Sequence, residues 1–185
     1  MGLIYVRVIS GSARGKKLVS PPDDRVRPTL DRVKESIFNM IAFSVPEANV
    51  LDLFAGSGAL GIEALSRGAS SAVFVDKSED SLSVVRENLK ITSLSGRAEC
   101  INSEFDDFLK SCTKSFDLIF LDPPYADGLL DKSLQLIFKN RLLKDGGYII
   151  CESDGKPEFV PDETLFCVHR LKHYGRVQIL LLTNV

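Results

Sequence analysis

Histidine and cysteine are sparse in this 185-residue sequence, which has two histidines, four cysteines and no tryptophan. The cysteines include no CxxC pair, so neither a zinc site nor a thioredoxin-like redox motif is predicted. His169 and His173 lie four residues apart, and no carboxylate is adjacent to either of them. We therefore expect a protein without a bound metal ion.

Long apolar runs are also missing. Runs such as residues 148–151 and 179–182 are far shorter than the roughly 20 residues that a membrane span needs. The first residues contain no basic segment followed by a long apolar stretch, so no signal peptide is predicted. We expect a cytoplasmic protein that does not bind membranes.

The composition is that of an ordinary globular protein, with 44% hydrophobic and 26% charged residues. The length suits one compact unit. Within it we expect an N-terminal basic arm, residues 1–45, packed on a body formed by residues 46–185.

Charge is distributed unevenly although the net charge is only −2. Residues 1–40 carry eight Lys and Arg and four Asp and Glu, a balance of 8 − 4 = +4, so the remainder carries −6. A basic segment on an acidic protein fits a phosphate-binding surface, as in nucleic-acid recognition. A solvated arm without a binding role is the alternative, and charge alone does not separate the two.

Strand and helix patterns alternate along the chain. In the arm, residues 5–9 and 17–19 predict a hairpin, and residues 30–43 predict an amphipathic helix. Strands in the body are predicted at 50–54, 71–76, 97–101, 116–121, 148–151, 165–170 and 176–183. Helices are predicted from about 59 to 67 and at 80–91, 105–110 and 129–140. These patterns predict an α/β fold with an open, mostly parallel sheet and an antiparallel edge.

A glycine-rich turn at residues 55–58 follows the first body strand. Open α/β sheets bind ligands at the carboxyl ends of their strands, and glycines let the backbone approach the ligand closely. The turn by itself fits a NAD site or only a tight turn. Asp52, inside the strand end, is a poor neighbour for a pyrophosphate but a good acceptor for an ammonium group. This favours S-adenosylmethionine, which has an ammonium group and no phosphate.

A second acid, Asp76, ends the next strand about 20 residues further on. An acid in this place accepts hydrogen bonds from the ribose hydroxyls of a nucleoside cofactor. NAD and S-adenosylmethionine both contain that ribose, so Asp76 predicts a nucleoside without saying which. Because Asp76 also precedes a helix, a role as a helix N-terminal acid is the alternative.

The third motif is Asp122-Pro123-Pro124-Tyr125, directly after the strand at 116–121. Two prolines fix the backbone and remove two N–H groups. The Asp122 carboxylate and the Pro123 carbonyl can then serve as paired acceptors for an NH2 group. Tyr125 offers a ring on which a base can stack, worth roughly 1–3 kcal/mol. The motif predicts methylation of an exocyclic amine of a base.

Together the three motifs resemble the class I, seven-stranded methyltransferases that methylate amino groups. Residues 7–18, residues 27–39 and the pair Tyr174-Gly175 are further similar to the bacterial 16S ribosomal RNA guanine-N2 methyltransferase family. The resemblance spans nearly the whole chain. It implies a Rossmann-like fold, S-adenosylmethionine as cofactor, and a guanine N2 in 16S ribosomal RNA as substrate. That RNA would be presented within a partly or fully assembled small ribosomal subunit.

The resemblance also implies roles for individual residues. Catalysis would fall to Asp122, Pro123 and Tyr125. The flipped guanine would contact Pro124 and Tyr125, and the residues that contact phosphates or order the arm would be Arg14, Lys16, Arg27, Arg32 and Lys34. The cofactor would be held by Asp52, Phe54, Ala55, Gly56, Ser57, Gly58, Asp76, Lys77, Ser103, Glu104 and Asp122.

The sequence departs from the family after the strand at 97–101. The family usually has a Gly-Asp pair near the adenine amino group, where this chain has Asn102-Ser103-Glu104. Either the Glu104 side chain replaces that acid, or Ser103 serves through its backbone.

Three other functions are compatible with parts of the pattern. An adenine-N6 methyltransferase on RNA or DNA would use the same tetrapeptide, but the chain has no room for the target-recognition domain of sequence-specific DNA enzymes. A protein-glutamine methyltransferase typically has Asn in the place of Asp122. A non-catalytic RNA-binding scaffold would not need Asp52, Asp76 and Asp122 together.

Overall fold

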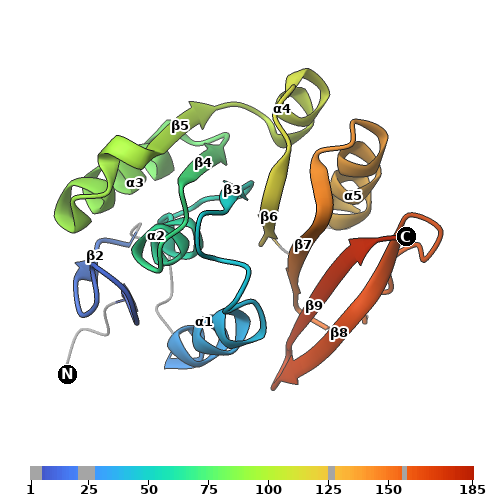
Figure 1. Ribbon diagram of the computed structural model, residues 1–185, viewed down its shortest axis with the longest axis horizontal. Coiled ribbons are helices and arrows are strands. Elements are labelled where there is room, and N and C mark those ends of the chain that lie inside the picture. The colour runs from blue at the N-terminus through green and yellow to red at the C-terminus, as the bar shows by residue number, and fades with distance from the viewer. Residues whose placement is uncertain (1–5, 21–27, 125–127, 156–157) are drawn as a thin grey trace.

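The computed structural model describes residues 6–20, 28–124, 128–155 and 158–185 (Figure 1). In the arm, strands β1 (Val6–Arg7) and β2 (Lys17–Leu18) form the predicted hairpin. Helix α1 spans Pro28–Met40 and so begins and ends earlier than residues 30–43. Proline suits the first turn of a helix, because the N–H it lacks would have no partner there.

The body alternates strands and helices as predicted. Its parallel strands are β3 (Asn49–Asp52), β4 (Ser71–Asp76), β5 (Ala98–Asn102), β6 (Phe116–Leu121) and β7 (Leu143–Ser153). The helices between them are α2 (Ala59–Ser66), α3 (Glu79–Thr92), the 3-10 turn η1 (Ser95–Arg97), α4 (Phe105–Ser111) and α5 (Leu129–Lys139). The last two strands are β8 (Phe166–Tyr174) and β9 (Val177–Asn184).

The seven body strands form one sheet in the order β5-β4-β3-β6-β7-β9-β8. Neighbours from β5 to β7 pair in parallel, whereas β9 is antiparallel to both β7 and β8. The prediction of an open, mostly parallel sheet with an antiparallel edge is therefore confirmed. Strand β7 begins at Leu143, five residues before the predicted start, and its register against β6 shifts between Phe116 and Leu118.

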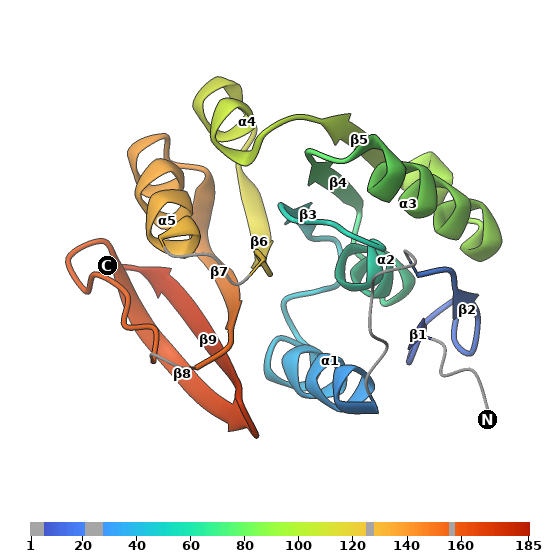
Figure 2. The ribbon, with the colours of Figure 1, turned by 180° about the vertical axis from the view of Figure 1, so that it is seen from behind.

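Helices cover both faces of the sheet (Figures 1 and 2). Alternate strand residues point to opposite faces, so the strands contribute to two cores. Val50 and Phe120 pack with α1, α2 and α3 in one core. Leu51 and Ile119, their neighbours in sequence, pack with α4 and α5 in a second core. Among the described residues, no helix is both long and apolar enough to cross a membrane.

The arm is attached to α2 by one buried carboxylate, Glu63. Its oxygens accept the backbone N–H groups of Ile9 and Ser10 at 2.8 and 3.0 Å. Arg67 lies 2.7 Å and the Lys34 ammonium 3.5 Å from the same carboxylate, and Lys34 also donates to the carbonyl of Arg7. Glu63 is fully buried, and groups from three separate segments compensate its charge.

A second attachment joins the turn of the hairpin to the end of α2. The Ser66 hydroxyl donates to the carbonyl of Ser10 and accepts the N–H of Ala13. Gly11 has φ +85°, and a Cβ atom there would lie 1.9 Å from the Ser66 carbonyl oxygen. Only glycine fits this approach, so Gly11 fixes how closely the arm lies on α2.

Candidate functional site

A cavity of about 1150 Å³ lies at the carboxyl ends of β3, β4, β6 and β7. Helix α1 and the tip of the β8–β9 hairpin, with Tyr174 and Arg176, also line it. The Ser36 hydroxyl hydrogen-bonds the Tyr174 hydroxyl, which ties α1 to that hairpin. The arm and the last two strands therefore enclose the end of the sheet where open α/β folds bind ligands.

Asp52, at the end of β3, is the most deeply buried acid of the cavity wall. One of its oxygens accepts the Gly61 N–H at 2.9 Å. Burial is the largest cause that raises the pKa of Asp52 to about 7; the Gly61 hydrogen bond lowers it, and the charges of Asp122 and Asp76 add to the rise. A carboxylate in this state is stabilised by a cation, because a positive charge beside it favours its ionised form.

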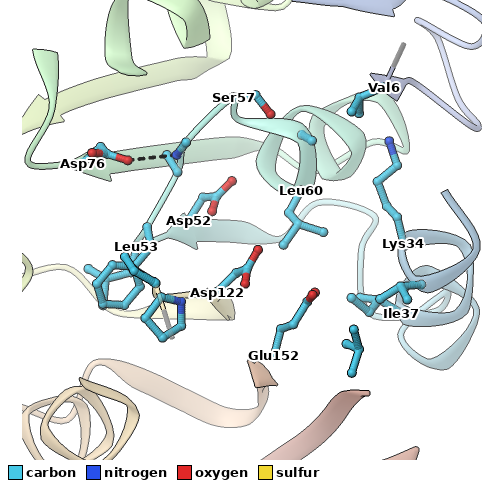
Figure 3. A pocket seen from close by; sticks show the side chains of 18 of the residues that line it. Val6, Lys34, Ile37, Asp52, Leu53, Ser57, Leu60, Asp76, Asp122 and Glu152 are labelled. Carbon is cyan, nitrogen blue, oxygen red and sulfur yellow. Dashed lines mark hydrogen bonds between the residues drawn. The ribbon is translucent and has the colours of Figure 1, made fainter. Parts of the chain in front are cut away.

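Asp76, at the end of β4, holds the glycine-rich turn in place. One of its oxygens accepts the N–H of Gly56 at 2.9 Å, the bond drawn in Figure 3. The other accepts the N–H of Ser78, also at 2.9 Å. Ser78 is the N-cap of α3 and its own hydroxyl accepts the N–H of Ser81, so the second bond lies just before the helix. The side chain still lines the cavity, and each carboxylate oxygen has a further lone pair for a ligand hydroxyl.

The contacts of the segment after β5 distinguish the two groups expected to contact an adenine amine, the Glu104 side chain and the Ser103 backbone. The N–H of Ser103 donates to the Asp76 carbonyl, and the Asn102 amide donates to the carbonyls of Asp76 and Lys77. The backbone donor of Ser103 is therefore used within the protein. Glu104 is exposed at the N-terminus of α4 and lines the cavity, which leaves its carboxylate free to face a ligand.

Asp122 and Glu152 continue the row of acids along the strand ends. Leu121 of β6 pairs with Cys151 of β7 in parallel register, so Asp122 and Glu152 follow at neighbouring positions. Figure 3 shows the carboxylates of Asp52, Asp122 and Glu152 directed into the same cavity. Burial and the charge of Asp122 raise the pKa of Glu152 to about 8. Three acids in one largely buried row suit a ligand that brings cationic or N–H groups.

The cavity wall also has an apolar part. The rings of Phe54 and Phe105 lie 5.4 Å apart between centroids, and both line the cavity. Leu60 and Ile37 line it from α2 and α1 (Figure 3). These surfaces offer contacts for a flat, partly apolar ligand beside the acids.

Most of the predicted cofactor residues meet at this cavity. Those that line it are Asp52, Phe54, Ala55, Gly56, Ser57, Asp76, Lys77, Ser103, Glu104 and Asp122. Gly58 does not line it. A Cβ atom on Gly58 would lie 3.1 Å from Val85 of α3, so this glycine serves the packing of α2 on α3.

Only some of the predicted substrate residues line the cavity. Pro123 and Pro124 line the cavity, whereas Tyr125 and Arg27 lie outside the described residues. Arg32 is exposed at the cavity edge, and Arg14 and Lys16 are exposed on the hairpin, away from the cavity.

The prediction that Lys34 contacts phosphates is wrong, because its ammonium group is buried and paired within the protein. Only 4% of this residue is exposed, its ammonium group is held by Glu63 and the Arg7 carbonyl, and burial lowers its pKa. Of the two roles expected for it, ordering the arm is the one that these contacts support.

Two positions at the site, Glu152 and Gly61, were not predicted. Glu152 follows a predicted strand directly, as Asp52, Asp76 and Asp122 do, and that shared placement could have revealed it. Gly61 completes a G-x-G-x-x-G spacing with Gly56 and Gly58. A Cβ atom on Gly61 would lie 2.3 Å from Phe74, so α2 could not approach the sheet and Asp52 as closely.

Within the described ranges, no group of three or more His, Cys, Asp and Glu side chains is arranged to hold a metal ion.

Comparison with known proteins places this geometry in a family. Residues 6–183 match the family described as Conserved hypothetical protein 95. The ribosomal RNA small subunit methyltransferase D of Escherichia coli is 37% identical over 172 residues, covering 93% of this chain and 86% of that protein. Its namesake in Haemophilus influenzae is 38% identical over 161 residues, with coverages of 85% and 83%.

Solved structures agree with this placement. The E. coli protein yhhF matches with a TM-score of 0.89 and 34% identity over 97% of this chain and 98% of its own. A Thermus thermophilus 16S rRNA N2 G1207 methyltransferase, solved with AdoMet and guanosine, matches with a TM-score of 0.67 over 89% of this chain and 45% of its own. At 22% identity, the second match supports the class I methyltransferase fold alone. The chain therefore belongs to the Conserved hypothetical protein 95 family, together with the ribosomal RNA small subunit methyltransferases D, as its motifs predicted.

Proposed function

We propose that this protein transfers a methyl group from S-adenosylmethionine to the exocyclic N2 amine of a guanine in 16S ribosomal RNA. The observation that carries the proposal is the pair of acids at the sheet end, the buried Asp52 and the partly buried Asp122, which line one cavity beside the Pro123-Pro124 turn. The family relation to small subunit rRNA methyltransferases supports the RNA substrate. Such an enzyme would work in the cytoplasm, on a partly or fully assembled small subunit.

The cofactor side of the cavity suits S-adenosylmethionine by its chemistry. Asp52 would accept the ammonium group, and Asp76 would accept a ribose hydroxyl while it holds the glycine turn. The exposed carboxylate of Glu104 would accept the adenine amine, since the Ser103 N–H is occupied. When bound, the cofactor supplies an electrophilic methyl group.

The substrate side of the cavity suits an aromatic amine. The lone pair of such an amine is delocalised into the ring, so it is a poor nucleophile until it is turned out of the ring plane. Asp122 would accept one N–H of the amine, and Pro123, which has no N–H of its own, would offer its carbonyl to the other. Positioning is then the main catalytic contribution, and Asp122 can take the proton that the amine loses once it is methylated.

The target base must leave its stack to reach this cavity, which costs a few kcal/mol. Arg32 at the cavity edge, with Arg14 and Lys16 on the hairpin, would offset this cost through contacts with RNA phosphates. These three side chains would also orient the RNA without reading its sequence. The alternative of adenine-N6 methylation would use the same groups, but no observation favours it.

A labelled methyl-transfer assay tests the proposal. Purified protein is incubated with labelled S-adenosylmethionine and unmethylated small ribosomal subunits, and the product nucleosides are separated. We expect the label in N2-methylguanosine. Label in N6-methyladenosine would support the rival enzyme, and no label together with no cofactor binding would support an RNA-binding scaffold.

A further inference from the structure

We propose that Glu152 selects guanine by accepting a hydrogen bond from the N1–H of the base, beside the amine held by Asp122. The inference rests on the proposed function and deepens it, because it names the base edge that is read and the residue that reads it. Glu152 would be a specificity-determining residue.

The sheet geometry sets Glu152 beside Asp122. Strands β6 and β7 pair in parallel with Phe120 opposite Ile150 and Leu121 opposite Cys151. Asp122 and Glu152 occupy the next step of this register, on the face to which Phe120 and Ile150 point. Neighbouring strands lie about 4.8 Å apart, so their side chains can contact adjacent groups of one base edge.

Glu152 is prepared for a ligand by what surrounds it. The residue is only 8% exposed and lines the cavity. Within the described part of the chain, no hydrogen bond or ion pair reaches its carboxylate, and the electrostatic effect on it comes from the repulsive charge of Asp122. A buried polar group without a partner is unfavourable by about 1–3 kcal/mol. A bound donor in the cavity would relieve this.

Two of the residues that line the cavity are lysines, Lys34 and Lys77, and in the described part of the chain neither pairs with Glu152. Lys34 extends from α1 toward Val6 at the cavity edge (Figure 3). Its ammonium group pairs with Glu63 and the Arg7 carbonyl. A neutral N–H donor from the ligand is therefore the partner that fits Glu152 best.

Guanine has this donor in the right place. Its Watson–Crick edge carries the N2 amine and the N1–H side by side, so two adjacent carboxylates can accept from both. Adenine has an acceptor at N1 instead, and it would meet the Glu152 carboxylate lone pair to lone pair. A site built to pair a substrate N–H rejects bases that lack it, because the site is then left unpaired.

The test uses a base analogue that keeps the reacting amine and changes only the neighbouring edge. The methylated guanine is first mapped by sequence-specific fragmentation of the labelled RNA, and it is then replaced by 2,6-diaminopurine in 16S RNA assembled into small subunits. The analogue keeps the 2-amino group, but its N1 is an acceptor. The reaction is run at about pH 8.5, above the raised pKa of Glu152 of about 8, so that its carboxylate is ionised. The ratio of kcat/KM for guanine over the analogue is measured.

The matched variants are Glu152→Gln and, as control, Glu163→Gln, which makes the same change at an exposed position outside the cavity. The amide introduced at position 152 can rotate to accept from guanine N1–H or donate to the analogue N1, so the ratio should fall about tenfold to a hundredfold. The Glu163→Gln protein should keep the wild-type ratio. Melting temperature and cofactor affinity, measured on both variants, separate a folding defect from a loss of selectivity.

The outcomes are distinct for the two proposals. Guanine methylation with equal rates on the analogue by the wild-type protein overturns the role of Glu152, and this measurement needs no variant. Guanine methylation with an unchanged ratio in Glu152→Gln overturns it too, and neither result affects the proposed function. Label in adenine on natural subunits overturns both.

Discussion

Two buried glutamates of this protein have opposite surroundings: one carboxylate has several partners within the protein, and the other faces a cavity. Glu63, between the arm and α2, is reached by two backbone N–H groups and two side-chain cations. Glu152, at the sheet end, faces a cavity, and among the residues described its one electrostatic neighbour is the like-charged Asp122. Both residues are less than a tenth exposed.

The difference separates a carboxylate that builds the protein from one that is kept for a ligand. Buried charges are stable when paired, so an acid that the fold leaves without donors points to a partner from outside. By this criterion Asp52 belongs with Glu152, because a single backbone N–H offsets its burial. The buried acids of the cavity should therefore affect reaction and ligand binding, whereas Glu63 should affect stability.

The largest effect is expected at Asp122. Replacing it by alanine removes one of the two acceptors of the target amine, so kcat should fall at least about a hundredfold to a thousandfold. Cofactor affinity and melting temperature should stay close to those of the wild-type protein. Labelled methyl transfer under saturating cofactor measures the loss. The control is Asp145→Ala at an exposed position of β7, and full activity of Asp122→Ala would contradict its catalytic role.

The Glu63→Gln variant should lose about 3–5 kcal/mol of unfolding free energy, because it leaves the buried Lys34 without its carboxylate. Denaturant titration measures this. The Glu152→Gln variant is the matched control and should unfold at the same denaturant concentration or a higher one, since it removes repulsion from Asp122. Equal destabilisation of the two variants would remove the distinction between these carboxylates.

Cofactor affinity should depend on pH through Asp52. Its pKa is raised to about 7, so S-adenosylmethionine affinity should fall by about tenfold per pH unit below that value as the carboxylate is protonated. The contribution of Asp52 to stability runs the other way and falls as pH rises from 3.8 to about 7. Calorimetric titrations across this window measure the affinity. In Asp52→Asn the slope should disappear, and a slope that persists would place the titrating group elsewhere.

The smallest effect is expected for Arg32→Ala. Loss of one phosphate contact should weaken RNA binding a few-fold and reduce the slope of log affinity against log salt by roughly 0.7–0.9. Filter binding at several salt concentrations measures both. Lys139→Ala, which removes the same charge from the exposed side of α5, should leave the slope unchanged. Equal slopes for all three proteins would exclude Arg32 from the RNA-binding surface.

Much of the fold and of the cofactor site could be predicted because the signals are local. Asp52, Asp76 and Asp122 each follow a short apolar run, and the parallel sheet brings such run ends together at one edge. The same rule covers Glu152, but no recognised motif surrounds it.

Other features depend on contacts between distant residues. Lys34 is a cation on an amphipathic helix, and its burial follows from Glu63, 63 − 34 = 29 residues away in the chain. The early start of β7 was hidden by Gly146-Gly147, which predicted a turn. Pairing with β6 instead includes this pair within the strand, with a shift of register.

One measurement compares the two kinds of carboxylate directly: the shift in unfolding midpoint caused by S-adenosylmethionine in Asp52→Asn and in Glu63→Gln. A ligand at a hundred times its Kd stabilises the folded state by about 2.7 kcal/mol. We predict that Glu63→Gln unfolds earlier than the wild-type protein but keeps the full ligand-induced shift. Asp52→Asn should unfold no earlier than the wild-type protein and lose the shift. A full shift in Asp52→Asn, or its loss in Glu63→Gln, would contradict the assignment of the cavity carboxylates to the cofactor.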